Sequence, residues 1–299
     1  MVMITREHKA VFYGSRIAWS ERLVGEAGAY GPRPAIVLLH GSPGTRHDWD
    51  QLVTHIRGDW RIILVDRPGY GSSGPASPVA ASIAGNARAI GALIESEAPE
   101  GAIVVGYSHA GGVAISLAAM RPGLVRGLAL LASIGSPLAI LPSDFVTAFP
   151  LLGGAFSFFL LRLLATLAPE VLAHLASASK PAPSSQAVSE MIRRSVEPPR
   201  VWKTYVREAR SMIEAAEDLQ ATLPLVTAPT LVVAGEADAM VPLEASIDLA
   251  ASIRSARLVI LERMGHSAPL ERPARIARLL IEFAEGVESD SADHVNASN

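Results

Sequence analysis

The sequence predicts an α/β fold in which a mostly parallel central sheet carries helices on both faces. Short runs rich in Val, Ile and Leu alternate with longer stretches of helical pattern from Pro34 onward. The runs are continuously apolar, as expected for strands buried on both faces, and a hairpin pattern precedes them. The expected parallel strands are 35–39, 61–65, 103–105, 127–131, 230–233 and 257–261.

The hairpin is expected at the edge of the sheet. Two short segments, 9–12 and 16–20, flank a turn at Gly14 and predict an antiparallel pair. Between the parallel strands, helices are expected at 48–57, 78–97, 109–121, 242–253 and 273–285. The second, fourth and fifth of these begin at a proline, which suits the first helical turn because no backbone donor is needed there.

The strand and helix alternation breaks between positions 136 and 222. Residues 136–189 carry four charged side chains among 54 residues, whereas residues 190–218 carry twelve among 29. This change predicts a helical insertion, 136–222, that caps the sheet domain with an apolar half and an amphipathic half. A segment rich in Pro and Ser, 180–185, is expected to link the two halves.

The remaining chain is expected to form one α/β core from residues 1–135 and 223–287. The last twelve residues, 288–299, are mostly small and polar and predict a disordered tail. The N-terminal stretch 1–23 mixes charged residues among apolar ones, so it lacks the uninterrupted apolar region of a secretory signal. We therefore expect a cytoplasmic protein.

The run 145–168 is apolar enough to raise the question of a membrane span. Pro150 and Arg162 interrupt it, and a span would place the two halves of the sheet on opposite sides of a membrane. We therefore expect helices whose aromatic and leucine side chains pack on the core or line a pocket. Interfacial membrane contact through 145–168 is the alternative.

Composition excludes several classes of function. The 299 residues contain 26 basic and 29 acidic side chains, a net charge of −3, which offers no general attraction for nucleic acid. The chain contains no cysteine, which excludes disulfide scaffolds, thiolate-bound metals and a cysteine nucleophile. No spacing of histidines suggests a metal site.

The strongest local signal is the sequence Gly-Tyr-Ser-His-Ala-Gly-Gly at 106–112, directly after an expected strand and before an expected helix. A serine at such a sharp turn presents its hydroxyl to solvent, and small neighbours avoid clashes with the strained backbone. The helix that follows directs free amides and its positive dipole end toward an oxyanion formed there. Ser108 is therefore the candidate nucleophile.

A serine nucleophile needs a base that a third group orients. Asp238 follows the expected strand 230–233, and His266 follows the expected strand 257–261. The carboxyl ends of parallel strands meet at one edge of the sheet, and the order serine, acid, histidine is that of nucleophile-elbow hydrolases. Glu236 lies in the same loop as Asp238 and is the alternative acid.

These features together resemble the α/β-hydrolase superfamily over the chain outside the insertion and the tail. The resemblance implies an oxyanion hole of two backbone amides, that of His109 and that of Ser42 in the segment His-Gly-Ser-Pro-Gly at 40–44. The segment 66–73 is similar to the family's loop after the next strand, where glycines shape the backbone. Ala110 departs from the glycine of many relatives by one methyl group.

The resemblance and the candidate triad imply a serine hydrolase without metal or organic cofactor. We expect it to cleave an ester of a small to medium, lipophilic substrate. Hydrolysis of a carbon–carbon, amide or lactone bond and cofactor-free perhydrolase activity are alternatives within enzymes. A ligand-binding receptor or sensor on the same scaffold is the alternative outside enzymes.

Overall fold

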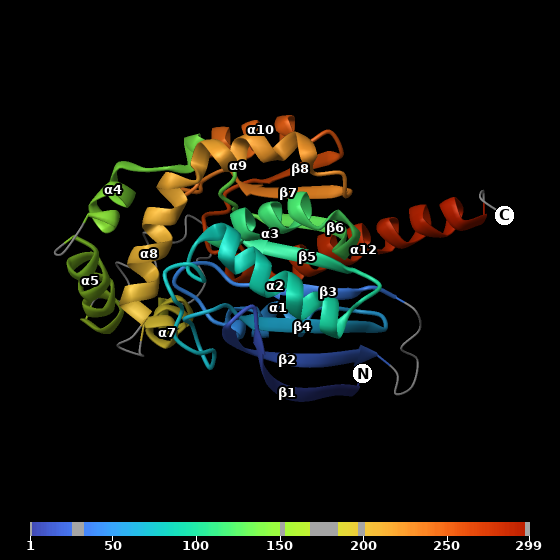
Figure 1. Cartoon of the computed structure of the whole chain (residues 1–299), viewed down its shortest axis with the longest axis horizontal. Helices are drawn as coiled ribbons and strands as arrows, with labels where there is room; N and C mark the ends of the chain where they lie inside the picture. The colour runs from blue at the N-terminus through green and yellow to red at the C-terminus, as the bar shows by residue number, and fades with distance from the viewer. Residues whose placement is uncertain (1, 26–32, 150–152, 168–184, 197–200, 297–299) are drawn as a thin grey trace.

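The computed structural model describes most of the chain, namely residues 2–25, 33–149, 153–167, 185–196 and 201–296. A single sheet of eight strands forms its centre (Figure 1), with the order β1-β2-β4-β3-β5-β6-β7-β8. The strands are β1 Val2–Phe12, β2 Ser15–Gly25, β3 Ala35–Leu39, β4 Trp60–Asp66, β5 Ala102–Tyr107, β6 Val125–Leu131, β7 Thr230–Gly235 and β8 Ala256–Leu261.

The sheet confirms the predicted fold class. The pairs β1–β2 and β2–β4 are antiparallel, and every other neighbouring pair is parallel. Each expected parallel strand is present within two residues of its expected bounds. The edge hairpin is longer than expected, because β1 runs in register with β2 from Val2 to Phe12.

Helices cover both faces of the sheet, as predicted. They are α1 Asp50–Val53, α2 Ile83–Glu97, α3 His109–Met120, α10 Leu243–Ser252, α11 Ala268–Glu271 and α12 Pro273–Asn296. Side chains of α2, α3 and α10 form one buried layer, and side chains of α1 and α12 form the other. Successive residues of β3 alternate between the layers, Ile36 facing the second and Val37 the first.

Three helix boundaries differ from those expected. The helix expected from position 78 begins at Ile83, because the Ser82 hydroxyl accepts the Gly85 amide hydrogen bond and caps the helix there. Pro242 is the N-cap of α10 and lies one position before the first turn. The helix expected at 48–57 is a short 3-10 turn, Arg46–Trp49, followed by α1.

The structure extends helix α12 into the segment 288–299, for which composition predicts a disordered tail. Helix α12 continues to Asn296, and neither proline nor glycine follows Gly286 in the sequence to end it earlier. Composition alone favoured disorder there, whereas the amphipathic helix that precedes the segment extends through it. Residues 297–299 lie outside the described part of the chain.

The helical insertion lies beyond the end of the sheet at which the parallel strands finish (Figure 1). Its elements are η3 Pro137–Ala139, α4 Pro142–Ala148, α5 Gly153–Leu167, α7 Ser185–Val196, α8 Val201–Glu214 and α9 Ala216–Thr222. The expected linker falls outside the described residues except for Ser185, which begins α7. Among the described helices, none is both long and apolar enough to cross a bilayer.

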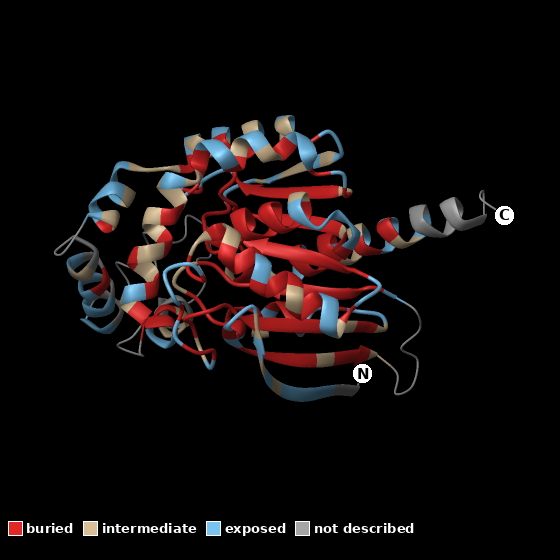
Figure 2. Cartoon of the chain, viewed as in Figure 1, coloured by how far each residue is buried: buried red, intermediate tan, exposed pale blue. Residues whose placement is uncertain are grey.

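The apolar run 145–168 is less buried than expected. Phe158 is fully buried and joins a cluster with Tyr70, Ile192 and Val201, but Phe156 and Phe159 on the same helix are 65% and 56% exposed. The reason is geometric, because α5 packs against α4, α7 and α8 of the insertion and turns its outer side to solvent. Figure 2 shows this outer side as exposed.

Candidate active site

Ser108 occupies the sharp turn between β5 and α3. Its φ of 54° and ψ of −121° are strained for a residue with a side chain. The neighbouring glycines permit the turn, since a Cβ at Gly106 would lie 2.6 Å from the Ala110 carbonyl oxygen and one at Gly111 would lie 1.5 Å from the Ser133 hydroxyl. The small residues noted in the sequence are therefore required by close packing around the serine.

The structure brings Ser108, His266 and Asp238 together. The Ser108 Oγ lies 3.0 Å from His266 Nε2, although 158 residues separate them in the chain. On the other side of the ring, His266 Nδ1 lies 2.9 Å from Asp238 Oδ2 and 3.2 Å from Oδ1. The three side chains thus form a continuous hydrogen-bonded chain.

Backbone amides hold the Asp238 carboxylate in position. Its Oδ1 accepts hydrogen bonds from the amides of Met240 at 2.8 Å and Val241 at 2.9 Å. The alternative acid is placed elsewhere, because Glu236 is exposed and its Oε2 accepts the Arg263 amide at 3.0 Å. Asp238 is therefore the acid of the two that contacts the histidine.

The segment that contains Ser42 lies against the serine. A Cβ added to Gly41 would lie 3.1 Å from the Ser108 Cβ, so only glycine permits this approach without a shift. The Gly41 carbonyl accepts a hydrogen bond from the Arg67 guanidinium at 2.7 Å and lies 2.8 Å from His40 Nδ1. Because the carbonyl and the amide of a trans peptide point in opposite directions, this clamp turns the Ser42 amide away from Arg67.

His40 acts as a neutral donor in this clamp. The Arg67 amide donates to His40 Nε2 at 3.0 Å, which leaves the ring proton on Nδ1, facing the Gly41 carbonyl. Burial and then the Arg67 charge hold the pKa of His40 well below its usual value. The orientation of the peptide between Gly41 and Ser42 is therefore fixed from two sides.

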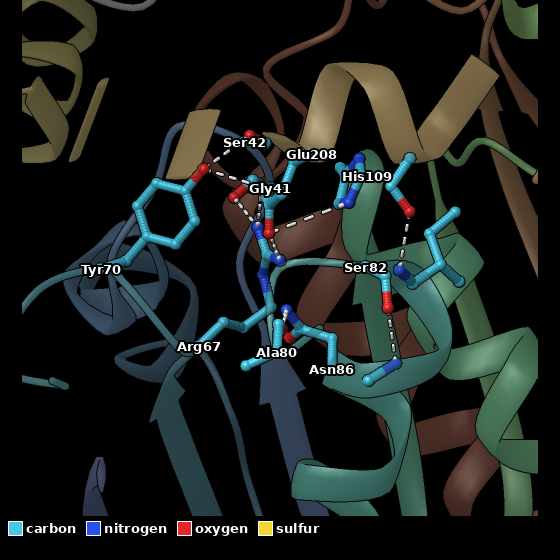
Figure 3. A network of polar contacts seen from close by, with 12 residues as sticks. Gly41, Ser42, Arg67, Tyr70, Ala80, Ser82, Asn86, His109 and Glu208 are labelled. Carbon is cyan, nitrogen blue, oxygen red and sulfur yellow. Dashed lines mark hydrogen bonds and ion pairs between the residues drawn. The ribbon is translucent and has the colours of Figure 1, made fainter. Parts of the chain in front are cut away.

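A buried polar network that the sequence analysis did not find connects this segment to the helical insertion (Figure 3). Arg67 forms a two-point ion pair with Glu208 of α8. The Tyr70 hydroxyl donates to Glu208 Oε2 at 2.7 Å and lies 2.8 Å from the Ser42 hydroxyl. The side chains of Arg67 and Glu208 are 0% and 1% exposed.

Burial and neighbouring charges determine the protonation states of Glu208 and His109 in this network. Burial raises the pKa of Glu208, but the nearby Arg67 guanidinium and His109 outweigh it and lower that pKa to about 2. Burial lowers the pKa of His109 to about 4. Near neutral pH, Glu208 is therefore charged and paired, whereas the His109 ring, 3.8 Å from Glu208, is neutral.

Acid should weaken this network. The depressed pKa of Glu208 contributes stability that is fully present above its ordinary value of 4.5 and is lost as pH falls toward about 2. We expect wild type to lose more unfolding free energy across this window than the variant Arg67→Met/Glu208→Met, measured by urea unfolding at stepped pH. Parallel losses in the two proteins would show that the pair contributes nothing to acid sensitivity.

A cavity of about 80 Å³ opens between the sheet edge and the helical insertion. The core contributes polar groups, including Ser108, His109 and His266, and α4 and α8 of the insertion close the other side. The complete lining is Ser42, Ser108, His109, Ile134, Ala139, Asp144, Thr147, Tyr205, Ala209, Met212, Met240, Val241 and His266. In the described part of the chain, no group of three or more acidic or histidine side chains is placed to hold a metal ion.

Comparison with known proteins agrees with this architecture. A pimeloyl-[acyl-carrier protein] methyl ester esterase of Neisseria meningitidis is 29% identical over 271 residues, which cover 84% of this chain and 94% of the relative. A monoacylglycerol lipase of Xenopus laevis is 25% identical over 266 residues, covering 88% and 78% of the two chains. The solved structure of a thermophilic esterase from Thermogutta terrifontis superposes with a TM-score of 0.72 at 22% identity, covering 94% of this chain and 99% of that one.

The family assignment rests on a match that covers most of the chain. A model of the alpha/beta hydrolase family matches residues 36–279, which span β3 to α12 and include all three members of the hydrogen-bonded chain. The expected resemblance is thereby confirmed: the chain is a member of the alpha/beta hydrolase family.

Proposed function

We propose that the protein is a serine hydrolase that cleaves an ester bond of a small to medium, lipophilic substrate through an acyl-enzyme. The observation that carries the proposal is the hydrogen-bonded chain from Ser108 through His266 to Asp238. A serine hydroxyl is a weak nucleophile until a base takes its proton, and here a base and its orienting carboxylate are both within hydrogen-bonding distance.

In acylation, the Ser108 Oγ attacks the ester carbonyl carbon and its proton passes to His266 Nε2. Asp238 orients the ring through Nδ1 and stabilises the imidazolium. The imidazolium then gives its proton to the alkoxy leaving group as the carbon–oxygen bond breaks. In deacylation, His266 takes a proton from water, whose oxygen attacks the acyl carbon. The imidazolium then gives this proton to Ser108 Oγ as the bond between the acyl carbon and Oγ breaks, which releases the acid and restores Ser108 and His266.

The oxyanion of each tetrahedral intermediate is assigned to the amides of Ser42 and His109. The His109 amide is in the first turn of α3, where backbone donors have no acceptor within the helix. The Ser42 amide is turned away from Arg67 by the clamp on the Gly41 carbonyl. Such donors act because they are fixed before charge develops, and removing one costs about 100- to 1000-fold in rate.

The cavity supports an uncharged, lipophilic substrate. The described lining contains Ile134, Met212, Met240 and Val241 and neither lysine nor arginine. A carboxylate group on the substrate would therefore meet no cation among these lining residues. Two of the similar proteins are named for ester cleavage, one on a methyl ester and one on a monoacylglycerol.

We assign the helical insertion the role of a cap over this cavity. Asp144 and Thr147 of α4 and Tyr205, Ala209 and Met212 of α8 line it together with Ser108. Substrate size and acyl-chain preference should therefore depend on these two helices.

The direct test of the proposed function is turnover of p-nitrophenyl esters of increasing acyl length. We expect many turnovers per enzyme molecule, with the highest kcat/KM for short to medium chains. Release of one equivalent of p-nitrophenol followed by arrest would instead indicate a receptor that traps its ligand, and absence of release would refute esterase activity.

Substitutions of Asp238 and Glu236, the two acids in the loop after β7, should have very different effects on kcat. We expect Asp238→Asn to lower kcat about 10⁴-fold, because the amide no longer fixes the histidine tautomer. The matched variant Glu236→Gln should retain kcat, since Glu236 contacts the Arg263 amide and not the histidine. Steady-state kinetics on one ester would contradict the assignment if Glu236→Gln were the more damaging change.

A further inference from the structure

The outer side of α5 is apolar. Its exposed large apolar residues follow one another at steps of three, one, three and four, which places them on one helical face: Phe156, Phe159, Leu160, Leu163 and Leu167. Their exposed fractions lie between 41% and 72%. Arg162 and Thr166 of the same helix are also exposed. A surface helix normally turns its polar side to water, whereas most of the exposed side chains of α5 are apolar.

Helix α4 extends the same kind of surface. Phe145, Val146 and Phe149 are 57%, 56% and 65% exposed, and α4 packs directly against α5. We call these three residues and the five on α5 the apolar face; Figure 2 shows exposed residues along both helices. Apolar surfaces of this extent, with aromatic residues grouped together, are typical of sites that bind a protein or a membrane.

A basic groove borders the apolar face. It has a volume of about 340 Å³, and Lys203, Arg207 and Arg210 of α8 line it together with Phe149 and Ala155. The remaining lining residues are Trp202 and Val206, so none of the described lining residues carries a carboxylate. Phe149 belongs to both the groove and the apolar face, which are therefore continuous.

The groove keeps its positive charge. Arg207 donates to the Ala76 carbonyl at 2.9 Å and Arg210 to the Ala148 carbonyl at 2.7 Å, which orients both guanidinium groups without neutralising them. In the described part of the chain, none of the three cations forms an ion pair with a carboxylate. The structure thus presents fixed positive charge beside exposed aromatic and aliphatic side chains.

We propose that the apolar face and the basic groove dock the protein on a lipid bilayer that contains anionic phospholipids. The apolar face would enter the acyl boundary while the cations meet phosphate groups. A second copy of the chain fits less well, because a two-fold contact through this face would bring two basic grooves toward each other. A lipid surface satisfies both the apolar and the charged part at once.

Helix α8 connects this surface to the catalytic cavity. Lys203, Arg207 and Arg210 line the groove, whereas Tyr205 and Met212, on another side of the same helix, line the cavity beside Ser108. If the proposed esterase function holds, docking would place the cavity next to lipophilic substrates held in the bilayer. The docking itself does not depend on that function.

Vesicle flotation of the full chain tests the proposal. We expect binding to vesicles of phosphatidylcholine with phosphatidylglycerol at least about tenfold tighter than to phosphatidylcholine alone, and weaker at high salt, because each cation near an anionic surface contributes roughly fivefold. Variant Phe156→Ser/Phe159→Ser/Leu163→Ser should lose at least about tenfold in binding, since removing apolar side chains removes insertion. Lys203→Gln/Arg207→Gln should lose the preference for phosphatidylglycerol.

The matched control replaces exposed apolar residues elsewhere. Val11→Ser/Val79→Ser/Ile247→Ser changes side chains that are 68%, 62% and 45% exposed and lie outside the apolar face, so it should bind vesicles like wild type. Turnover of a soluble p-nitrophenyl ester should be the same in the Phe156 variant as in wild type, which separates loss of docking from loss of catalysis. Wild-type activity without vesicle binding would overturn the docking proposal alone.

A second measurement uses tryptophan fluorescence. Trp202 lines the groove, whereas Trp19, Trp49 and Trp60 are at most 3% exposed. Phospholipids brominated in the upper acyl chain should quench wild-type fluorescence and leave Trp202→Phe unquenched. The proposal is overturned if the protein binds neither vesicles with phosphatidylglycerol nor vesicles without it. It is also overturned if the protein binds inorganic phosphate but no vesicles, or if light scattering shows a dimer through this face that does not bind vesicles.

Discussion

Replacing Ser108 by alanine is expected to lower kcat for ester hydrolysis by about 10⁴- to 10⁶-fold, because the nucleophile is removed while the binding cavity remains. The substitution keeps a Cβ at the strained turn, so the melting temperature should change little. Steady-state and single-turnover kinetics on a p-nitrophenyl ester would measure the loss.

The matched control for this variant is Ser42→Ala. It removes a hydroxyl in the same cavity but keeps the backbone amide assigned to the oxyanion, so kcat should fall by less than about tenfold. A Ser108→Ala protein that turns over within tenfold of wild type would show that another residue is the nucleophile.

The buried ion pair between Arg67 and Glu208 should dominate the stability of the contact between the core and the helical insertion. Arg67→Met leaves the buried Glu208 without its cation, which costs about 3–5 kcal/mol of unfolding free energy. Arg67→Met/Glu208→Met removes both charges and should recover most of that loss. Urea unfolding, analysed for midpoint and slope, measures both.

The double variant also separates stability from catalysis. It should fold well yet keep a low kcat, because the Gly41 carbonyl loses the guanidinium that fixes the adjoining Ser42 amide. Single-variant losses that simply add in the double variant would contradict the account of a coupled pair.

The sequence was sufficient for the sheet because the buried strands are short, continuous apolar runs that alternate with helical patterns. It was also sufficient to bring Ser108, Asp238 and His266 together as candidates, since each follows a predicted strand and parallel strands finish at one edge. Spacing from the strand end favoured Asp238 over Glu236 as the acid, and the structure places Asp238 against the His266 ring.

The network of Arg67, Tyr70 and Glu208 could not be predicted. Arg67 and Glu208 are 141 residues apart, and neither periodicity nor composition encodes a contact between a loop and an inserted helix. The segment 66–73 attracted attention for its glycines, while its arginine and tyrosine make the contacts. From sequence alone, a glutamate on an amphipathic helix is expected to be solvent-exposed, because charged side chains are rarely buried without a partner.

For the run that contains α5, the sequence favoured burial and left interfacial membrane contact as the alternative. An apolar run such as 145–168 predicts burial, because burial of apolar area is what normally stabilises such residues. The helix buries Phe158 and leaves its outer face uncovered, since only other helices of the insertion pack against it. Within the same run, Thr147 of α4 lines the cavity beside Ser108, and Ala155 of α5 lines the basic groove.

The central claim is that Ser108 is activated by His266 and Asp238, and covalent labelling tests it most directly. Wild type treated with a fluorophosphonate should gain one adduct, which peptide mass spectrometry places on Ser108, and labelling should slow by orders of magnitude in His266→Ala. An adduct on another residue, or equal labelling rates in wild type and His266→Ala, would contradict the account.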